Sequence, residues 1–188
     1  IQSDELNKII SKENFKEFIL KKIPHEWNGY EVVLGEEMYV NNWKLSKILK
    51  HAKNKFFKNP KFFIKKNQNI KLHFDVFHGD GYLDKAISFL KEEERKDFND
   101  FVNNKSSFNR ENLFFCRSPE IMNNYFNSVF EWLEKCEKEF GFNLNGYSLK
   151  RLYAFLAERY LSFWFQKYSN YLTWPIFFYD TNVNRVKV

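Results

Sequence analysis

A glutamate and an arginine lie side by side in the most apolar stretch of the chain. Glu158 and Arg159 interrupt residues 148–168, where apolar side chains point to every side of a predicted helix. Such a helix is usually buried, and a buried charge is costly unless it is paired or hydrogen-bonded. A buried carboxylate can act as a general base. The residues alone leave a second interpretation equally open, a structural ion pair of Glu158 with Arg151 or Arg159.

Histidine and aspartate side chains gather around two glycines at residues 73–84, HFDVFHGDGYLD. We interpret the chain from residue 70 up to a break at Gly79-Asp80-Gly81 as extended, with His73 and Asp75 on one face, and we expect a helix to start at Tyr82 or Leu83. Glycine loops ahead of helices commonly bind phosphates or sugar hydroxyls, and two histidines with an aspartate could hold a divalent ion. The helix dipole alone also explains Asp84 in the first helical turn.

A third polar cluster, SFNRENLF at residues 107–114, comes just before a predicted buried strand at 113–116. Amide, guanidinium and carboxylate groups at a strand edge are common binding elements in α/β proteins. An Asn-rich turn is the simpler interpretation of the residue types alone.

The remaining pattern supplies the elements that must position these clusters. Helical spacing of apolar residues predicts helices at 4–23, 42–57, 91–102 and 119–140, the last beginning after Ser118 and ending at Gly141. Short apolar runs predict strands at 30–34, 113–116 and 174–178. This alternation indicates an α/β, α-rich fold with a small sheet packed by long helices.

Composition limits the partners without choosing among them. The chain has 188 residues, 20% of them aromatic, and a net charge of +6, which permits attraction to nucleic acid, anionic lipid or anionic polysaccharide. Only six of its basic residues are arginines, which argues against sequence-specific reading of nucleic acid. Two cysteines are too few for a disulfide scaffold and favour a reducing cytoplasm, and no apolar run is long enough to span a bilayer.

Aromatic pairs alternate with lysines in KFFKNPKFFIKK at residues 55–66. Such a segment can lie at an anionic membrane surface or stack on bases. The simpler alternative is a lysine-rich connection whose phenylalanines turn inward. No P-loop, dinucleotide fingerprint, nucleophile elbow, zinc spacing or kinase motif is found, so those enzyme classes lose their support.

Taken in chain order, the clusters resemble the family known as domain of unknown function 4422, over roughly residues 30–180. That family looks like GT-A-type glycosyltransferases of bacterial capsule and surface-polysaccharide loci. The matching segments are YEVVL (30–34), HFDVFHGDGYLDKAI (73–87), SFNRENLFFCR (107–117), VFEWLEKCE (129–137), RLYAFLAERYLSFWF (151–165) and WPIFF (174–178).

On the matching positions the resemblance implies an active site. Glu158 would be the catalytic base or would bind the acceptor, and Arg159 would orient it or neutralise phosphate. The implied substrate-binding residues are His78, Asp80 and Asp84 in the glycine loop, with Arg110 and Asn112 in the second cluster. The residues do not identify metal ligands, and Mn²⁺ or Mg²⁺ is a candidate cofactor alongside the nucleotide-sugar donor.

The resemblance thus predicts a glycosyltransferase that moves a sugar from a nucleotide sugar to a glycan acceptor. We expect a cytoplasmic protein with peripheral contact to the inner membrane through residues 55–66 and no nucleic-acid partner. The family's Thr-His-Lys-like and His-Tyr-Arg-Arg-like motifs and a DxD motif do not occur, so residues 1–188 are expected to be a single domain that forms the C-terminal share of a larger one. The alternative is a non-catalytic module of a capsule-assembly protein that binds glycan or a partner.

Overall fold

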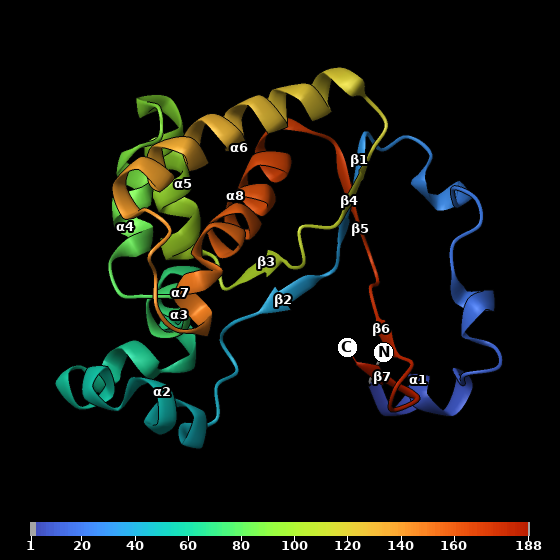
Figure 1. Cartoon of the computed structure of the whole chain (residues 1–188), viewed down its shortest axis with the longest axis horizontal. Coiled ribbons are helices and arrows are strands. Elements are labelled where there is room, and N and C mark those ends of the chain that lie inside the picture. The colour runs from blue at the N-terminus through green and yellow to red at the C-terminus, as the bar shows by residue number, and fades with distance from the viewer. Residues whose placement is uncertain (1–2, 188) are drawn as a thin grey trace.

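The computed structural model, which describes residues 3–187, confirms an α/β fold that is rich in helix (Figure 1). The helices are α1 (Ser3–Ile9), α2 (Leu45–Lys58), α3 (Ile70–Phe77), α4 (Tyr82–Ser88), α5 (Glu92–Asn104), α6 (Pro119–Phe140), α7 (Tyr147–Lys150) and α8 (Leu152–Tyr168). Four 3₁₀ turns accompany them: η1 (Phe15–Phe18), η2 (His25–Trp27), η3 (Pro60–Phe63) and η4 (Lys65–Asn67). The strands are β1 (Val32–Gly35), β2 (Glu37–Tyr39), β3 (Ser107–Asn109), β4 (Phe114–Cys116), β5 (Tyr171–Trp174), β6 (Phe178–Asp180) and β7 (Arg185–Lys187).

The strands form three small sheets. β1 lies in the centre of the largest, antiparallel to β4 and parallel to β5. Gly35 is opposite Trp174, so the carboxyl ends of β1 and β5 meet at one edge. β2 pairs with β3, and β6 forms a hairpin with β7. In α/β sheets, the carboxyl ends of parallel strands are the usual place for a ligand.

The core is built around α8, which lies beneath α6 and contacts α5 and β3 (Figure 1). Trp132 of α6 packs its ring 4.8 Å from that of Tyr160 and donates its indole N–H to the Ala86 carbonyl oxygen at 2.7 Å. Phe98 of α5 lies edge-on to both rings. The prediction that the aromatic-rich segment 148–168 is buried is confirmed for α8, although the helix begins only at Leu152.

Helix α6 forms where the sequence predicts it. Ser118 Oγ accepts a hydrogen bond from the Ile121 N–H, Pro119 occupies the first turn, and Gly141 ends the helix with a φ of 65°. The predicted inner face is buried at Tyr125, Val129, Trp132 and Cys136. Cys136 is therefore a core residue.

The prediction of extended chain from residue 70 up to the glycine break is wrong, because Ile70–Phe77 is helix α3. Asn69 caps the helix by accepting from the Leu72 N–H at 2.8 Å. In a helix His73 and Asp75 point in different directions: His73 is buried, whereas Asp75 pairs with Lys71 at 2.9 Å. The break at Gly79-Asp80-Gly81 is confirmed, since both glycines have a left-handed φ.

The predicted helix at 4–23 is also shorter than expected, because α1 ends at Ile9. Asn14 Oδ1 accepts from the Ser11 N–H at 2.7 Å, and Asn14 Nδ2 donates to the Ile9 carbonyl at 2.9 Å. These side-chain bonds replace the helical ones. Asn7 of α1 instead joins β7, accepting from the Val186 N–H at 2.6 Å, which brings the two ends of the chain together (Figure 1).

Two predicted strands have different limits or burial. The late strand expected at 174–178 is divided, since β5 ends at Trp174 and β6 starts at Phe178. Pro175 has no N–H to continue the ladder. β4 forms as predicted but is only half-buried, because it is an edge strand.

The lysine-rich segment 55–66 combines both interpretations of its aromatic rings. It covers the end of α2 and the turns η3 and η4. Phe63 is buried and Phe56 half-buried, whereas Phe57 and Phe62 are exposed. Among residues 3–187, no helix is both long enough and apolar enough to cross a bilayer.

Candidate functional site

Arg159 lies at the centre of a buried cluster, with only 1% of its surface exposed. Its Nη1 donates to the Phe155 carbonyl oxygen at 3.2 Å and to Glu158 Oε2. The Phe108 ring of β3 covers the guanidinium at 4.1 Å. Burial lowers the pKa of Arg159 to about 10, so the side chain stays charged at neutral pH.

Two histidines contact the other terminal nitrogen of Arg159, Nη2. Nη2 donates to His73 Nδ1 at 3.3 Å and to His78 Nε2 at 3.1 Å. An arginine has no acceptor, so both histidines must present an unprotonated nitrogen to it. Burial and, second, the charge of Arg159 lower the pKa of His78 to about 3 and that of His73 well below its usual value. Both imidazoles are therefore neutral at pH 7.

Glu158 is the member of the cluster that reaches the surface, with 14% of its side chain exposed. Its Oε2 pairs with Arg159, and its Oε1 accepts from the Glu111 N–H at 2.7 Å. Glu111 and Asn112 have left-handed φ angles of 76° and 48°, an uncommon conformation for two residues in a row that are not glycine. Glu158 therefore holds a strained turn, which comprises residues 110–112, between β3 and β4.

Asn109, the residue before the turn 110–112, connects the turn to the carboxyl end of β1. Asn109, fully buried, donates from Nδ2 to the Gly35 carbonyl oxygen at 2.6 Å. Its backbone N–H donates to Ser162 Oγ at 2.6 Å, and its Oδ1 accepts from Gln166 at 3.2 Å. Helix α8 thus fixes the turn and the strand edge together.

Two predicted binding residues, Arg110 and Asn112, lie in the turn 110–112, on either side of Glu111, whose N–H donates to Glu158. Asn112 is exposed and donates from Nδ2 to the Ala154 carbonyl oxygen at 3.3 Å. Arg110 is half-buried, and its Nη2 lies 3.9 Å from a carboxylate oxygen of Glu36, at the limit of an ion pair. The turn whose Glu111 N–H binds Glu158 therefore also carries a guanidinium and an amide group.

The two aspartates of the glycine loop lie in other ion pairs. Asp80 is exposed and pairs with Lys55, and Asp84 pairs with Lys71 at 2.7 Å. The structure thus unites His78 with Glu158 and Arg159, but not Asp80 or Asp84. Among residues 3–187, no three His, Cys, Asp or Glu side chains gather in a way that could hold a metal ion.

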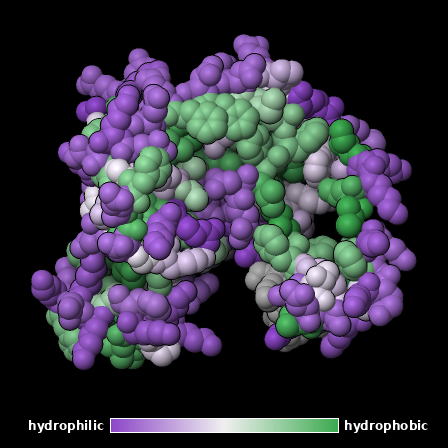
Figure 2. All heavy atoms as spheres, viewed as in Figure 1, coloured by the Kyte–Doolittle hydropathy of each residue, from purple (hydrophilic) through white to green (hydrophobic). Residues whose placement is uncertain are grey.

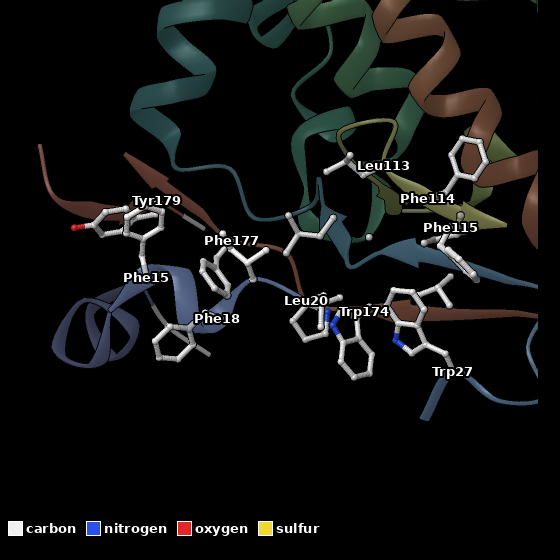
Figure 3. Close-up of a pocket in the computed structure, with 16 residues that line it drawn as sticks. Phe15, Phe18, Leu20, Trp27, Leu113, Phe114, Phe115, Trp174, Phe177 and Tyr179 are labelled. Atoms are coloured by element: carbon white, nitrogen blue, oxygen red, sulfur yellow. The ribbon is translucent and has the colours of Figure 1, made fainter. Parts of the chain in front are cut away.

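An open apolar groove adjoins the polar turn (Figure 3). It has a volume of about 590 Å³ and follows the carboxyl ends of β1 and β5. Trp27 and Trp174 lie edge to face at 5.5 Å in its wall, and Phe15 stacks on Tyr179 at 5.1 Å. Gly35 lines this groove, and its carbonyl oxygen accepts from Asn109, which directly precedes the turn 110–112. In Figure 2 the molecule is hollowed between the helices and the part that carries its two ends.

A family model described as Domain of unknown function (DUF4422) matches residues 34–170. The chain belongs to the DUF4422 family. No curated protein and no solved structure gives a significant match. The predicted family is confirmed, and its glycosyltransferase character stays a prediction. The DUF4422 region contains the Arg159 cluster, the turn at 110–112 and every predicted site residue, whereas α1, β6 and β7 lie outside it.

The sequence pattern does not by itself identify three side chains that support the DUF4422 site. It presents His73 only as a metal candidate, and it does not mark Asn109 and Ser162 as site residues. A signal was present, because Arg159, Ser162 and Gln166 follow one another at helical spacing in an otherwise apolar helix. Polar residues on one stripe of a buried helix must find partners.

Proposed function

We propose that the DUF4422 chain is a glycosyltransferase that moves a sugar from a nucleotide-sugar donor to a glycan acceptor. One observation carries the proposal: the Glu158 carboxylate is fixed at both oxygens and reaches the surface beside the carboxyl ends of a parallel strand pair. This is where α/β sheets commonly bind ligands. The predicted resemblance to capsule glycosyltransferases supplies the reaction class.

In this reaction Glu158 accepts the proton of an acceptor hydroxyl. The hydroxyl oxygen attacks the anomeric carbon of the donor sugar, a new glycosidic bond forms, and the bond to the diphosphate breaks. The nucleoside diphosphate leaves with the electron pair. Each carboxylate oxygen of Glu158 keeps a lone pair beyond its one bond to the chain, so it can still accept a proton.

The residues around Glu158 have different roles in the proposed reaction. Arg159 is buried and acts by fixing the position of the Glu158 carboxylate, and His78 acts through Arg159. Arg110 and Asn112 are placed to bind sugar hydroxyls or phosphate oxygens. Asp80 and Asp84 would contact the substrate only if it extends to the glycine loop. The described residues offer no ligand set for Mn²⁺ or Mg²⁺, so we derive no step through a metal.

The proposal also includes the location of the protein in the cell. In the segment 55–66, Phe57, Lys58 and Lys61 are exposed, a combination that suits contact with an anionic membrane surface. We propose a bacterial protein of capsule synthesis in the cytoplasm, peripheral at the inner membrane, with no nucleic-acid partner.

A second function is favoured by one observation, namely that both Glu158 oxygens already have partners within the chain. Glu158 would then be a purely structural anchor of the turn 110–112. The chain would be a non-catalytic module that binds glycan or a partner of a capsule-assembly protein.

The test combines donor turnover with a matched pair of variants. The chain is incubated with UDP-, GDP- and CDP-sugars and an oligosaccharide panel, with and without Mn²⁺ or Mg²⁺, and products are measured by mass spectrometry. Glu158→Gln should lower transfer by about 100-fold or more while the circular dichroism spectrum is unchanged. Glu111→Gln, at an exposed neighbouring carboxylate, should retain activity. Full activity of Glu158→Gln would remove it as the base, and glycan binding without product from any donor would favour the binding module.

A further inference from the structure

A second groove, lined by amides and lysines, lies on the helical part of the molecule. It has a volume of about 400 Å³ and forms where η4 and the start of α3 face the end of α5. Among the described residues, its lining includes two lysines and six Asn or Gln residues, but no carboxylate. An anionic ligand would meet no repulsion from the lining there.

The walls of the groove are held in place by hydrogen bonds. Gln68 is buried and donates to the Phe63 carbonyl oxygen at 2.7 Å. Asn69, the cap of α3, donates from Nδ2 to the Asn103 carbonyl oxygen at 2.8 Å and so joins the two sides. Asn41 donates to Ser106 Oγ at 3.3 Å at the far end. A groove whose shape is preformed loses little conformational entropy on binding.

Four side chains of the lining remain available to a ligand. Lys65 and Lys66 are exposed, and neither is ion-paired among the residues that the structure describes. The Asn104 side chain is exposed, and the Phe62 ring is 53% exposed. An ammonium group binds a carboxylate, an amide both donates to and accepts from hydroxyls, and an aromatic ring covers an apolar face. A sugar that carries a carboxylate presents all three features.

We propose that this groove binds an acidic glycan, a chain of sugars that carry carboxylates, and that it holds the acceptor of the transfer. The acceptor role, unlike the binding of an acidic glycan, rests on the proposed function. Strand β3 joins the two places, since Ser106, just before it, lines the groove and the N–H of Glu111, shortly after it, donates to Glu158. The five residues of chain from Ser106 to Glu111 span at most about 17 Å, a length that a short oligosaccharide can cover. Only one aromatic ring lines the groove, so the row of stacking rings typical of single-stranded nucleic-acid sites is missing there.

The direct test compares two probes that differ only in charge. Oligogalacturonate and its methyl ester share one sugar backbone, and binding of each to the intact chain is measured by isothermal titration calorimetry. The acid should bind at least about tenfold more tightly than the ester, and the difference should shrink at high salt. Equal affinity of the two probes would overturn the proposal.

Matched lysine variants locate the binding on the molecule. Lys65→Gln with Lys66→Gln should weaken binding of the acid by about tenfold, and Asn104→Ala by a few fold. Lys58→Gln with Lys61→Gln removes the same charge from the same segment but outside the groove, and should change the affinity less than twofold. All of these side chains are exposed, so the variants are expected to fold. An equal loss in both lysine pairs would show unspecific attraction and overturn the proposal.

Two further probes separate the glycan from other anionic partners. Phosphatidylglycerol vesicles or poly(U) that bind through Lys65 and Lys66 more tightly than oligogalacturonate would overturn the assignment to a glycan. Binding of the acid by the wild-type chain, with no transfer from any donor, would retain the acidic-glycan site and reject both the glycosyltransferase and the acceptor role.

Discussion

The two buried histidines beside Arg159 should make the protein sensitive to mild acid. His78 has a usual pKa of 6.5 in the unfolded chain and a pKa of about 3 in the folded one, because burial and the Arg159 charge disfavour its protonated form. The unfolded state therefore binds a proton that the folded state does not. The stability is fully present above pH 6.5 and is lost as the pH falls from there towards 3.

The size of the effect follows from the linkage relation. Between pH 7.5 and pH 5.0, protonation of one such histidine in the unfolded chain lowers the free energy of unfolding by about 2 kcal/mol. The result hardly depends on the folded value as long as that value lies below about 4. His73 should add a similar loss, because its pKa is also well below its usual value.

The assay is urea unfolding followed by tryptophan fluorescence at both pH values. His78→Gln keeps an acceptor for Arg159 Nη2 but cannot titrate, so its loss of stability on acidification should be about 2 kcal/mol smaller than that of the wild-type chain. His25→Gln, at an exposed histidine outside the cluster, should follow the wild type. Equal losses in wild type and His78→Gln would refute the argument that His78 is held neutral.

Three further substitutions test how the site is supported. Arg159→Met should lower the free energy of unfolding by about 3–5 kcal/mol, since it leaves Glu158 without its buried partner. The control is Arg151→Met at an exposed arginine, which should cost far less in urea unfolding. Similar costs for the two variants would contradict the buried ion pair. Asn109→Ala should cost about 3 kcal/mol, because the Gly35 carbonyl loses its donor, and a loss below about 1 kcal/mol would mean that water replaces the amide. Ser118→Ala should lower stability by about 1 kcal/mol through loss of the α6 cap, whereas Ser118→Asp should retain it in thermal melts.

The elements that the sequence predicted correctly are those with several signals in agreement. Helix α6 has a cap at Ser118, a proline in the first turn, a continuous apolar stripe and a terminating glycine. Strand β1 combines β-branched residues with a glycine at each side of the run. Where local signals and long-range packing favour the same structure, the sequence is sufficient.

Helix α3 was missed because its sequence fits two periods. In IKLHFDVF the apolar residues alternate, as in a strand, yet Ile70 and Phe74 are also four apart, as on one face of a helix. The deciding feature is the Asn69 cap, together with the packing of α3 on α5. The error had a consequence for the site, because a strand would have placed His73 and Asp75 together as metal ligands. The helix directs His73 to Arg159.

The sequence predicts the central pair of the candidate site, Glu158 and Arg159, but not which of the two is exposed and which is buried. A charged pair in an apolar helix indicated Glu158 and Arg159, but the helical register alone could not show which side chain reaches the surface. The exposed fractions are 1% for Arg159 and 14% for Glu158. Arg159 joins α8 to His73 and His78 and lies under Phe108, so the same charge that is costly to bury connects three separate segments. For the proposed transfer, this geometry makes Glu158 and the turn at 110–112 the groups that can meet a ligand, and Arg159 the positioning residue behind them.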